Sequence, residues 1–114
     1  MNIALTGASG FIGAAVAKHA AEQGHSVTAL VRNTSKREHI EPFVSTFVAG
    51  SHDDPIAAAQ LLEDADVVIH DSFDWAAIKD GGTQAHLQSN LVGSINLLEA
   101  SNEKQFIYMS SIAV

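Results

Sequence analysis

Cysteine is absent from this 114-residue sequence, which excludes disulfide bonds and thiolate metal sites but fixes no compartment. Basic residues number six against thirteen acidic ones and form no basic patch, which argues against nucleic acid as a partner. No apolar run approaches the ~20 residues that a membrane-spanning helix needs. The histidines are scattered without metal-ligand spacing, and the Gly-x-Ser-x-Gly of a serine nucleophile elbow is missing.

Targeting signals and internal linkers are also missing from the sequence. Strand-like residues begin directly at Asn2, with no charged segment leading into an apolar one, which argues against a signal peptide. No repeat, linker or low-complexity stretch divides the chain, and its length suits one domain with a modest core. We therefore expect one soluble, cytoplasmic domain that contacts no membrane.

What the sequence does contain is an unbroken alternation of short apolar runs with segments of helical periodicity. Such alternation predicts an α/β fold with a parallel sheet and right-handed crossovers. We predict a Rossmann-like, doubly wound parallel sheet in the strand order 3-2-1-4-5. The expected strands are Asn2–Leu5, Ser26–Val31, Phe43–Ala49, Asp66–His70 and Gln105–Met109, and the expected helices span about 10–23, 35–41, 55–64 and 83–101.

Several local signals refine the helices. Pro42 is expected to end the short second helix, and Asp54-Pro55 reads as an N-cap followed by proline at the first helical position. Gly93 and Ser94, inside the last helix, indicate close packing against a neighbour. The predicted buried faces consist of apolar residues at helical spacing: Ile56, Ala59 and Leu62 in the third helix, and Leu87, Leu91, Ile95 and Leu98 in the last.

The stretch from Thr6 to Gly13 places three glycines, Gly7, Gly10 and Gly13, where the first strand turns into the first helix. A dinucleotide-binding turn needs glycine because the turn is tight and the backbone must approach a pyrophosphate closely. The first helical N–H groups then point at that anion, aided by the helix dipole. The alternative, a glycine-rich turn that binds nothing, stays open on this evidence alone.

The polar turn after the second strand, residues 32–37, holds the densest positive charge in the chain. NAD-binding proteins place an acidic residue near this position to bind the ribose 2′-OH, whereas this sequence has Val31 and Arg32. An arginine can pair with a 2′-phosphate through charge-assisted hydrogen bonds, with Lys36 or Arg37 adding to it. We therefore predict NADP as the cofactor, with NAD as second choice; a merely solvated basic loop is the alternative.

Three motifs together resemble one family, the extended short-chain dehydrogenases/reductases of the NAD(P)-dependent epimerase/dehydratase kind. Residues 6–13 match its T-G-x-x-G-x-x-G, residues 90–100 match its N-x-x-G-[TS]-x-N-L-L-E-A helix, and residues 106–114 match the strand that delivers a catalytic serine. The resemblance covers nearly the whole chain. It implies that residues 1–114 form the NAD(P)-binding Rossmann domain, the N-terminal part of a longer enzyme.

The resemblance implies a role for each matched position. The backbone of Gly10, Phe11 and Ile12 would meet the pyrophosphate, and Ser111 would hydrogen-bond the substrate oxygen as a catalytic residue. Asn90 would help to hold the active-site end of the sheet. The full set of expected cofactor-binding residues is Gly7, Ser9, Gly10, Phe11, Ile12, Gly13, Arg32, Asn33, His52, Asp53, Ser72, Phe73 and Asn90, and no metal ligand is expected.

The sequence departs from the family pattern at two loops. Family members usually carry G-D-x-x-D after the third strand to bind the adenine amino group, but Ser51 stands at the first acidic position here, which moves the expected contact to His52 or Asp53. After the fourth strand the family reads H-x-A-A, whereas this chain has Ser72 and Phe73 in place of the alanines. We expect a cofactor pocket that is either reshaped or poorer at binding the cofactor.

The family's catalytic tyrosine is expected directly after Val114, with its lysine four residues later, and neither is in this chain. Since that pair supplies the general acid/base, we expect the 114 residues alone to show no turnover. The favoured hypothesis is an NADP-dependent oxidoreductase or epimerase/dehydratase, acting on a carbinol or keto group of a small molecule such as a nucleotide sugar. The alternative is a non-catalytic NAD(P)-binding sensor or regulatory module, and a homodimer is possible in either case.

Overall fold

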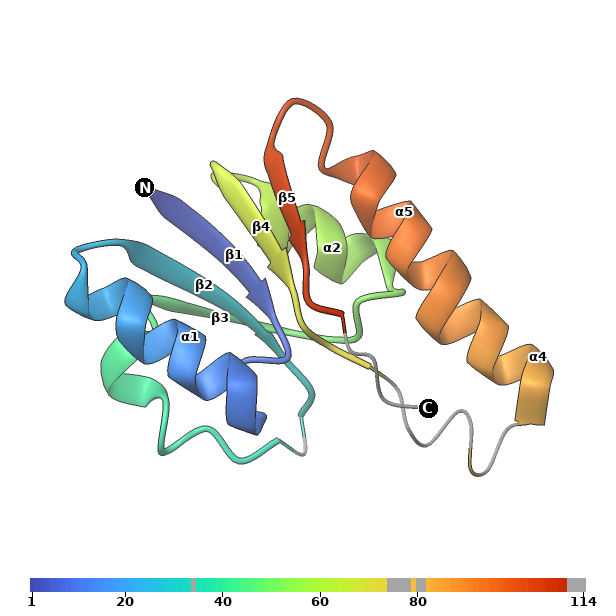
Figure 1. Cartoon of the computed structure of the whole chain (residues 1–114), viewed down its shortest axis with the longest axis horizontal. Coiled ribbons are helices and arrows are strands. Elements are labelled where there is room, and N and C mark those ends of the chain that lie inside the picture. Colours follow the sequence, from blue (N-terminus) through green and yellow to red (C-terminus); the bar gives the residue numbers. More distant parts are fainter. Residues whose placement is uncertain (34, 74–78, 80–81, 111–114) are drawn as a thin grey trace.

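The computed structural model describes residues 1–33, 35–73, 79 and 82–110 of the chain. Its centre is a parallel sheet of five strands in the order β3-β2-β1-β4-β5, which confirms the predicted fold (Figure 1). The strands are β1 (Asn2–Thr6), β2 (Ser26–Val31), β3 (Thr46–Ala49), β4 (Val67–His70) and β5 (Gln105–Tyr108).

Helices cover both faces of the sheet, with α1 on one side and α2 on the other (Figure 1). On the first side lie α1 (Phe11–Glu22) and the short 3₁₀ helix η1 (Glu41–Phe43). On the second side lie α2 (Pro55–Leu62) and a long helical path made of α4 (Gly82–His86), the π-helical segment η2 (Leu87–Val92) and α5 (Gly93–Ala100).

Two apolar cores result, because successive strand residues point to opposite faces of a sheet. Ile3 and Leu5 pack with Ala17 and Ala20 of α1 in the first core. Ala4, between them in the sequence, packs with the second core under α2 and α5. Both faces of the central strands are therefore covered, as expected for a parallel sheet.

The segment before β3 differs from the prediction. The expected helix over 35–41, ended by Pro42, is wrong: the structure has a 3₁₀ helix over Glu41–Phe43 with Pro42 in its first turn. Proline is tolerated there because the first turn of a helix has no intrahelical partner for that N–H. Phe43 belongs to this helix, so β3 begins at Thr46 and not at Phe43.

Helix α2 has the predicted cap but a different buried face. The backbone N–H of Ile56 donates to Asp54 Oδ1 over 3.0 Å, which confirms the N-cap. The predicted buried face is wrong at Ile56, which is 73% exposed, and at Ala59, which is also exposed, but it is confirmed at Leu62. The buried residues are Ala57, Ala58, Leu61 and Leu62, because the small alanines let the helix approach the sheet closely.

The apolar stripe predicted for the last helix is also wrong. Leu87, Leu91, Ile95 and Leu98 are 44–52% exposed, whereas Ser89, Asn90, Gly93 and Leu97 are buried. Three of these four buried residues are small or polar, and Gly93 is needed because the helix lies very near the loop after β3: a Cβ built on Gly93 would stand 2.8 Å from Asp53 Cβ. This closeness confirms the packing role predicted for Gly93.

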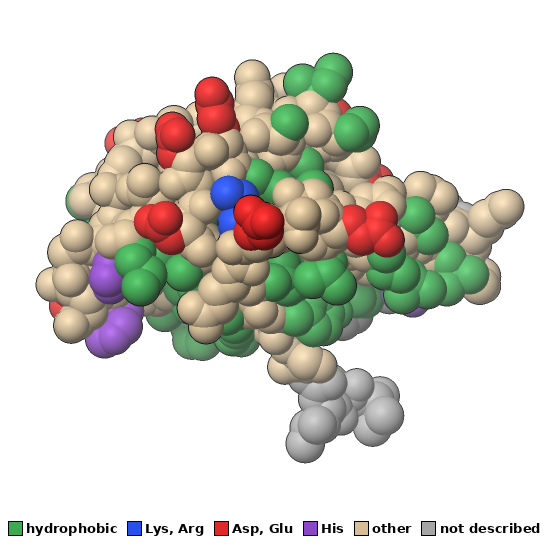
Figure 2. Space-filling view, turned by 90° about the horizontal axis from the view of Figure 1, so that it is seen from above, with side chains coloured by type: hydrophobic (Ala, Val, Ile, Leu, Met, Phe, Trp, Pro, Cys, Tyr) green, Lys and Arg blue, Asp and Glu red, His purple; other side chains and the backbone are tan. Residues whose placement is uncertain are grey.

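The face of the sheet that carries α1 is open over β4 and β5. Ile69 is half-buried, while Ile107 and Met109 are 39% and 36% exposed. A neighbouring apolar groove of about 510 Å³ lies between α1 and the sheet, lined in part by Ile3, Val16 and Ile69. Figure 2 shows hydrophobic side chains at the surface over much of the molecule's right-hand part. Among the described residues, no helix is long and apolar enough to cross a membrane.

We expect the 114-residue chain to bind a hydrophobic dye such as anilinonaphthalene sulfonate and to self-associate, because a contiguous apolar face and an open strand edge favour association. Ile107→Lys should lower dye fluorescence and shift sedimentation toward the monomer. Ile56→Lys is the matched control, since Ile56 is exposed on the outer side of α2, and it should leave both unchanged. A monodisperse, dye-negative wild-type chain would contradict this expectation.

Candidate functional site

The turn between β1 and α1 leaves no room for side chains at two glycines. Gly7 has a φ of +72°, and a Cβ on it would stand 2.6 Å from the carbonyl oxygen of Asp71. A Cβ on Gly13 would stand only 1.8 Å from the carbonyl oxygen of Gly7. Both positions therefore require glycine, and the turn presses its backbone against the residues that follow β4.

The N-terminus of α1 opens at this turn without a capping side chain. Gly10 is the N-cap residue and makes no side-chain cap, and the first turn of the helix contains no acidic residue. The first N–H groups of a helix have no intrahelical carbonyl to bind, so an uncapped N-terminus offers them to an external acceptor. The helix dipole favours an anion at this end.

A pocket of about 620 Å³ lies at the carboxyl edge of the sheet, directly before this helix N-terminus. Four segments converge on it, because parallel strands all end at the same edge. The glycine turn provides Gly7, Ser9, Gly10, Phe11 and Ile12; β2 and the turn after it provide Leu30, Val31, Arg32 and Ser35; the loop after β3 provides Gly50, Ser51 and His52; and the residues after β4 provide Asp71, Ser72 and Phe73.

Nine of the thirteen expected cofactor-binding residues line this pocket, and four do not. Gly13 lies in α1 outside the pocket lining, and its lack of a side chain leaves room for the Gly7 carbonyl oxygen. Asn33, Asp53 and Asn90 also lie outside the lining. Ser111, the expected catalytic residue, lies outside the described residues.

Arg32 is held at the pocket by the turn that follows β2. The N–H of Ser35 donates to the Arg32 carbonyl over 3.0 Å, and the N–H of Arg32 donates to Ser35 Oγ over 3.2 Å. The Arg37 guanidinium instead lies over the Phe47 ring, 5.2 Å from its centroid. Of the three basic residues predicted to bind phosphate, Arg32 therefore lines the pocket, and Lys36 and Arg37 do not.

A buried network fixes the end of β4. Thr6 Oγ1 accepts hydrogen bonds from the backbone N–H groups of Asp71 (2.9 Å) and Ser72 (3.1 Å), and it lies 2.7 Å from His70 Nδ1. Since both lone pairs of the hydroxyl are taken, its proton is donated to Nδ1. His70 Nε2–H then donates to Ser94 Oγ (2.8 Å), whose own proton goes to the Asn90 carbonyl (2.6 Å).

This network holds His70 in one neutral tautomer. His70 and Thr6 are each 0% exposed, and burial together with the neighbouring His52 lowers the pKa of His70 from 6.5 to about 4. A second proton on Nδ1 would also meet a hydroxyl that has no lone pair left to accept it. His70 is therefore a neutral structural link between β1, β4 and α5.

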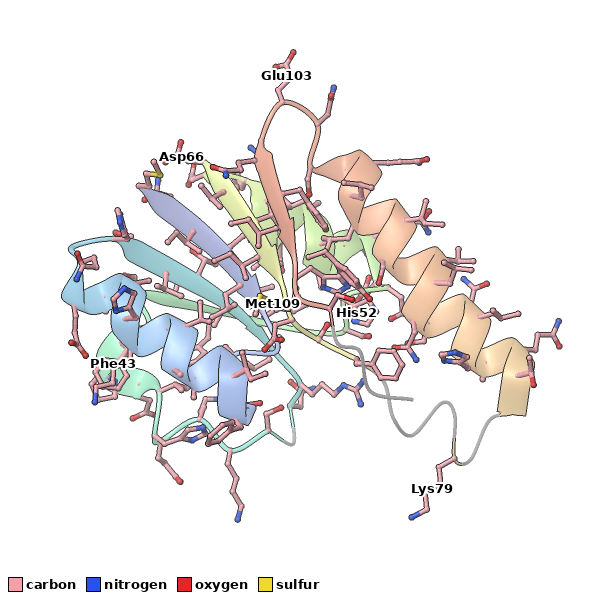
Figure 3. The ribbon with its side chains drawn as sticks, viewed as in Figure 1. Phe43, His52, Asp66, Lys79, Glu103 and Met109 are labelled. Atoms are coloured by element: carbon pink, nitrogen blue, oxygen red, sulfur yellow. The ribbon has the colours of Figure 1, made fainter. Side chains whose placement is uncertain are left out.

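His52 lies at the carboxyl edge of the sheet, on the side of the long helix (Figure 3). It is 4% exposed, and its ring centroid lies 4.9 Å from that of His70. Its Nε2 donates to the Ser89 carbonyl over 2.7 Å, and its Nδ1 lies 2.8 Å from Ser72 Oγ. Both ring nitrogens are thus engaged within the protein, which places His52 under the pocket as a support for Ser72.

Two further residues after β4 shape the rim. Burial raises the pKa of the Asp71 carboxyl, which lines the pocket. Phe73 is 40% exposed, and its ring centroid lies 5.8 Å from that of His86. His86 in turn accepts a hydrogen bond from the Asn90 amide (3.0 Å) in the π-helical segment, so Phe73 leans toward the long helix.

Sequence reasoning missed Thr6, Ser89 and Ser94 as parts of this site. The parallel register pairs Thr6 with His70, so the strand alignment held the signal for one contact. The contacts of Ser89 and Ser94 depend on the rotation of the long helix, which was predicted with the wrong face buried.

Comparison with known proteins identifies one family. The sequence model of the NAD dependent epimerase/dehydratase family matches residues 3–114. A phenylcoumaran benzylic ether reductase of Ginkgo biloba is 34% identical over 113 residues, covering 92% of this chain and 34% of its own length. The photosystem II assembly factor Ycf39 of Synechocystis is 27% identical and covers 96% of this chain and 33% of its own length.

Among solved structures, UDP-glucose 4-epimerase from Stenotrophomonas maltophila, with bound NAD and formylated UDP-arabinopyranose, superimposes with a TM-score of 0.80. It is 26% identical, and the match covers 98% of this chain and 37% of the epimerase. The chain thus spans about a third of the length of the Ginkgo reductase and of Ycf39.

The shifted pKa of His70 predicts how stability depends on pH. Its folded-state pKa of about 4 lies below the unfolded value of 6.5, so its contribution is complete above pH 6.5 and is lost as the pH falls toward 4. The free energy of unfolding should fall by about 3 kcal/mol over this window from His70 alone.

Urea unfolding at several pH values measures this slope. His70→Gln should flatten it, while His19→Gln, at an exposed position of α1, should leave it as in the wild type. An unchanged slope in His70→Gln would show that another group takes up the proton.

Proposed function

The chain belongs to the NAD dependent epimerase/dehydratase family, and from this premise we propose that it is the cofactor-binding portion of an NADP-dependent oxidoreductase or epimerase/dehydratase. The observation that carries the proposal is the uncapped N-terminus of α1, which opens into the pocket beside the glycine turn. In a doubly wound sheet, ligands bind where the strand order reverses, and here that point lies between β1 and β4.

The residues present fit a dinucleotide. The N–H groups of Phe11 and Ile12 would bind the pyrophosphate, and Gly7 and Gly10 keep the turn free of side chains that would block it. Arg32 would bind the 2′-phosphate of NADP from the end of β2. When bound, the nicotinamide group supplies hydride transfer to or from a carbinol or keto carbon.

The substrate side of the proposal rests on the family. The related epimerase binds a UDP-sugar beside NAD, which supports a nucleotide sugar or a similar small molecule as substrate. Ser111 is proposed to hydrogen-bond the substrate oxygen. The family's tyrosine and lysine are not among these 114 residues, so we propose that the residues 1–114 bind cofactor without turnover.

A second candidate is a non-catalytic dinucleotide-binding module. Similarity to an assembly factor supports it, as do Ser72 and Phe73 where the family has alanines. A Tyr-x-x-x-Lys in the residues after Val114 would favour the enzyme. A homodimer also remains a proposal, and the exposed Leu87, Leu91, Ile95 and Leu98 provide apolar surface for it.

Arg32→Ala tests the cofactor. Loss of a charge-assisted hydrogen bond costs about 1.5–3 kcal/mol, so the Kd for NADP should rise about tenfold or more, while that for NAD should change little. Isothermal titration calorimetry measures both constants.

Arg37→Ala is the matched control, because its guanidinium lies over Phe47 and not in the pocket lining. It should leave both dissociation constants unchanged. Equal losses of NADP and NAD affinity in Arg32→Ala would contradict the NADP assignment, and absence of binding by the wild type would contradict dinucleotide binding itself.

A further inference from the structure

Which of Ser72 and His52 donates the proton in their shared hydrogen bond can be decided from the other contact of the His52 ring. The Ser89 carbonyl can only accept, so His52 Nε2 carries a proton in every state of the ring. A neutral His52 therefore has an unprotonated Nδ1, and the Ser72 hydroxyl must donate its proton to it over the 2.8 Å contact. In this state Ser72 Oγ can only accept hydrogen bonds from the pocket side.

A second proton on His52 reverses the hydrogen bond. Nδ1–H then donates to Ser72 Oγ, and the hydroxyl proton turns away from the ring. Ser72 lines the pocket, so this proton becomes available to a ligand there. An anionic oxygen needs donors, which makes the reversed state the one that suits a phosphate-bearing ligand.

We propose that Ser72 contacts the bound dinucleotide and that binding of this anion is coupled to uptake of a proton by His52, which turns the Ser72 hydroxyl from acceptor to donor. The inference rests on the proposed dinucleotide binding and adds a determinant of affinity to it. Histidine suits this task, because it is the side chain that ordinarily changes charge between pH 5 and 8.

The groups around His52 are compatible with the added charge. His70 packs against its ring from β4 and stays neutral in this range, since burial lowers the pKa of His70 to about 4. The loop of His52 also contains Asp53 and Asp54, and the same pocket is lined by Asp71 just after β4 and by Arg32 from the turn after β2. The long helix presents the Ser89 carbonyl, which accepts from the ring in both states.

The test uses NAD as the probe, because NADP carries a 2′-phosphate that itself titrates in this pH range. The Kd of the wild-type chain, measured by isothermal titration calorimetry, should be about tenfold lower at pH 5.5 than at pH 8. His52→Gln should reduce this difference below about twofold, since glutamine can donate to Ser89 and accept from Ser72 but takes up no proton. Ser72→Ala should weaken binding most at pH 5.5.

His19→Gln, far from the pocket on α1, is the control and should keep the wild-type pH dependence. Asp71→Asn tests whether the Asp71 carboxyl causes the pH dependence instead. This variant should keep the wild-type dependence of the Kd on pH. The proposal would be overturned if Asp71→Asn lost that dependence while His52→Gln kept it. A wild-type Kd for NAD that is the same at pH 5.5 and pH 8 would overturn the coupling alone, whereas absence of NAD and NADP binding at any pH would overturn the proposed function.

Discussion

The hydroxyl of Thr6 is the contact on which the arrangement of this site depends. It accepts from the two N–H groups that follow β4 and donates to His70, so one buried oxygen ties the end of β1 to the end of β4. An unsatisfied buried donor costs about 1–3 kcal/mol, so this oxygen gives the chain after β4 a strong preference for one path. That path brings the Asp71 carbonyl against Gly7 and sets Ser72 above His52.

The same oxygen determines where protons lie further along the network. Because Thr6 donates to His70 Nδ1, the opposite nitrogen must donate to Ser94, and Ser94 must donate to the Asn90 carbonyl. Asn90 lies in the π-helical segment, where the wider turn alters the usual i to i−4 pairing of the backbone. The long helix is thereby joined to the sheet by directed hydrogen bonds from polar residues, with Leu97 packed in the core and Leu87, Leu91 and Leu98 exposed on the outer side.

The fold could be predicted from the sequence because strand and helix periodicities are local properties, and alternation alone selects a parallel, doubly wound sheet. The glycine turn could be predicted for a similar reason, since Gly7 and Gly13 meet a steric demand that no other residue satisfies. The rotation of each helix about its own axis could not be predicted from the sequence. In α2 and in the last helix, apolar spacing suggested one face, but the buried face was decided by small residues: Ala57 of α2 lies in the core, and Gly93 lies close to Asp53 and His52 in the loop after β3.

The site was predicted in its outline but not in its hydrogen bonds. Arg32 and the glycine turn follow from position along the chain, whereas the partners of His52 come from η2, which holds Ser89, and from the loop after β4, which holds Ser72. Read in sequence alone, His52 was a possible adenine contact, and Ser72 was an isolated departure from a family alanine. Only the folded chain shows that residues twenty positions apart form one pair.

This pairing changes the meaning of Ser72, which stands after β4 where the family has alanine. A serine in place of alanine would by itself add a polar atom to the pocket floor, and a buried histidine would by itself be costly, because each polar nitrogen needs a partner. Together they satisfy each other, with the Ser89 carbonyl taking the remaining N–H. Phe73 also has a partner within the protein, since its ring packs near that of His86 at the rim of the pocket. The pocket thus combines a hydrogen-bonded support under Ser72 with the glycine turn and the helix N-terminus without a side-chain cap on its other side.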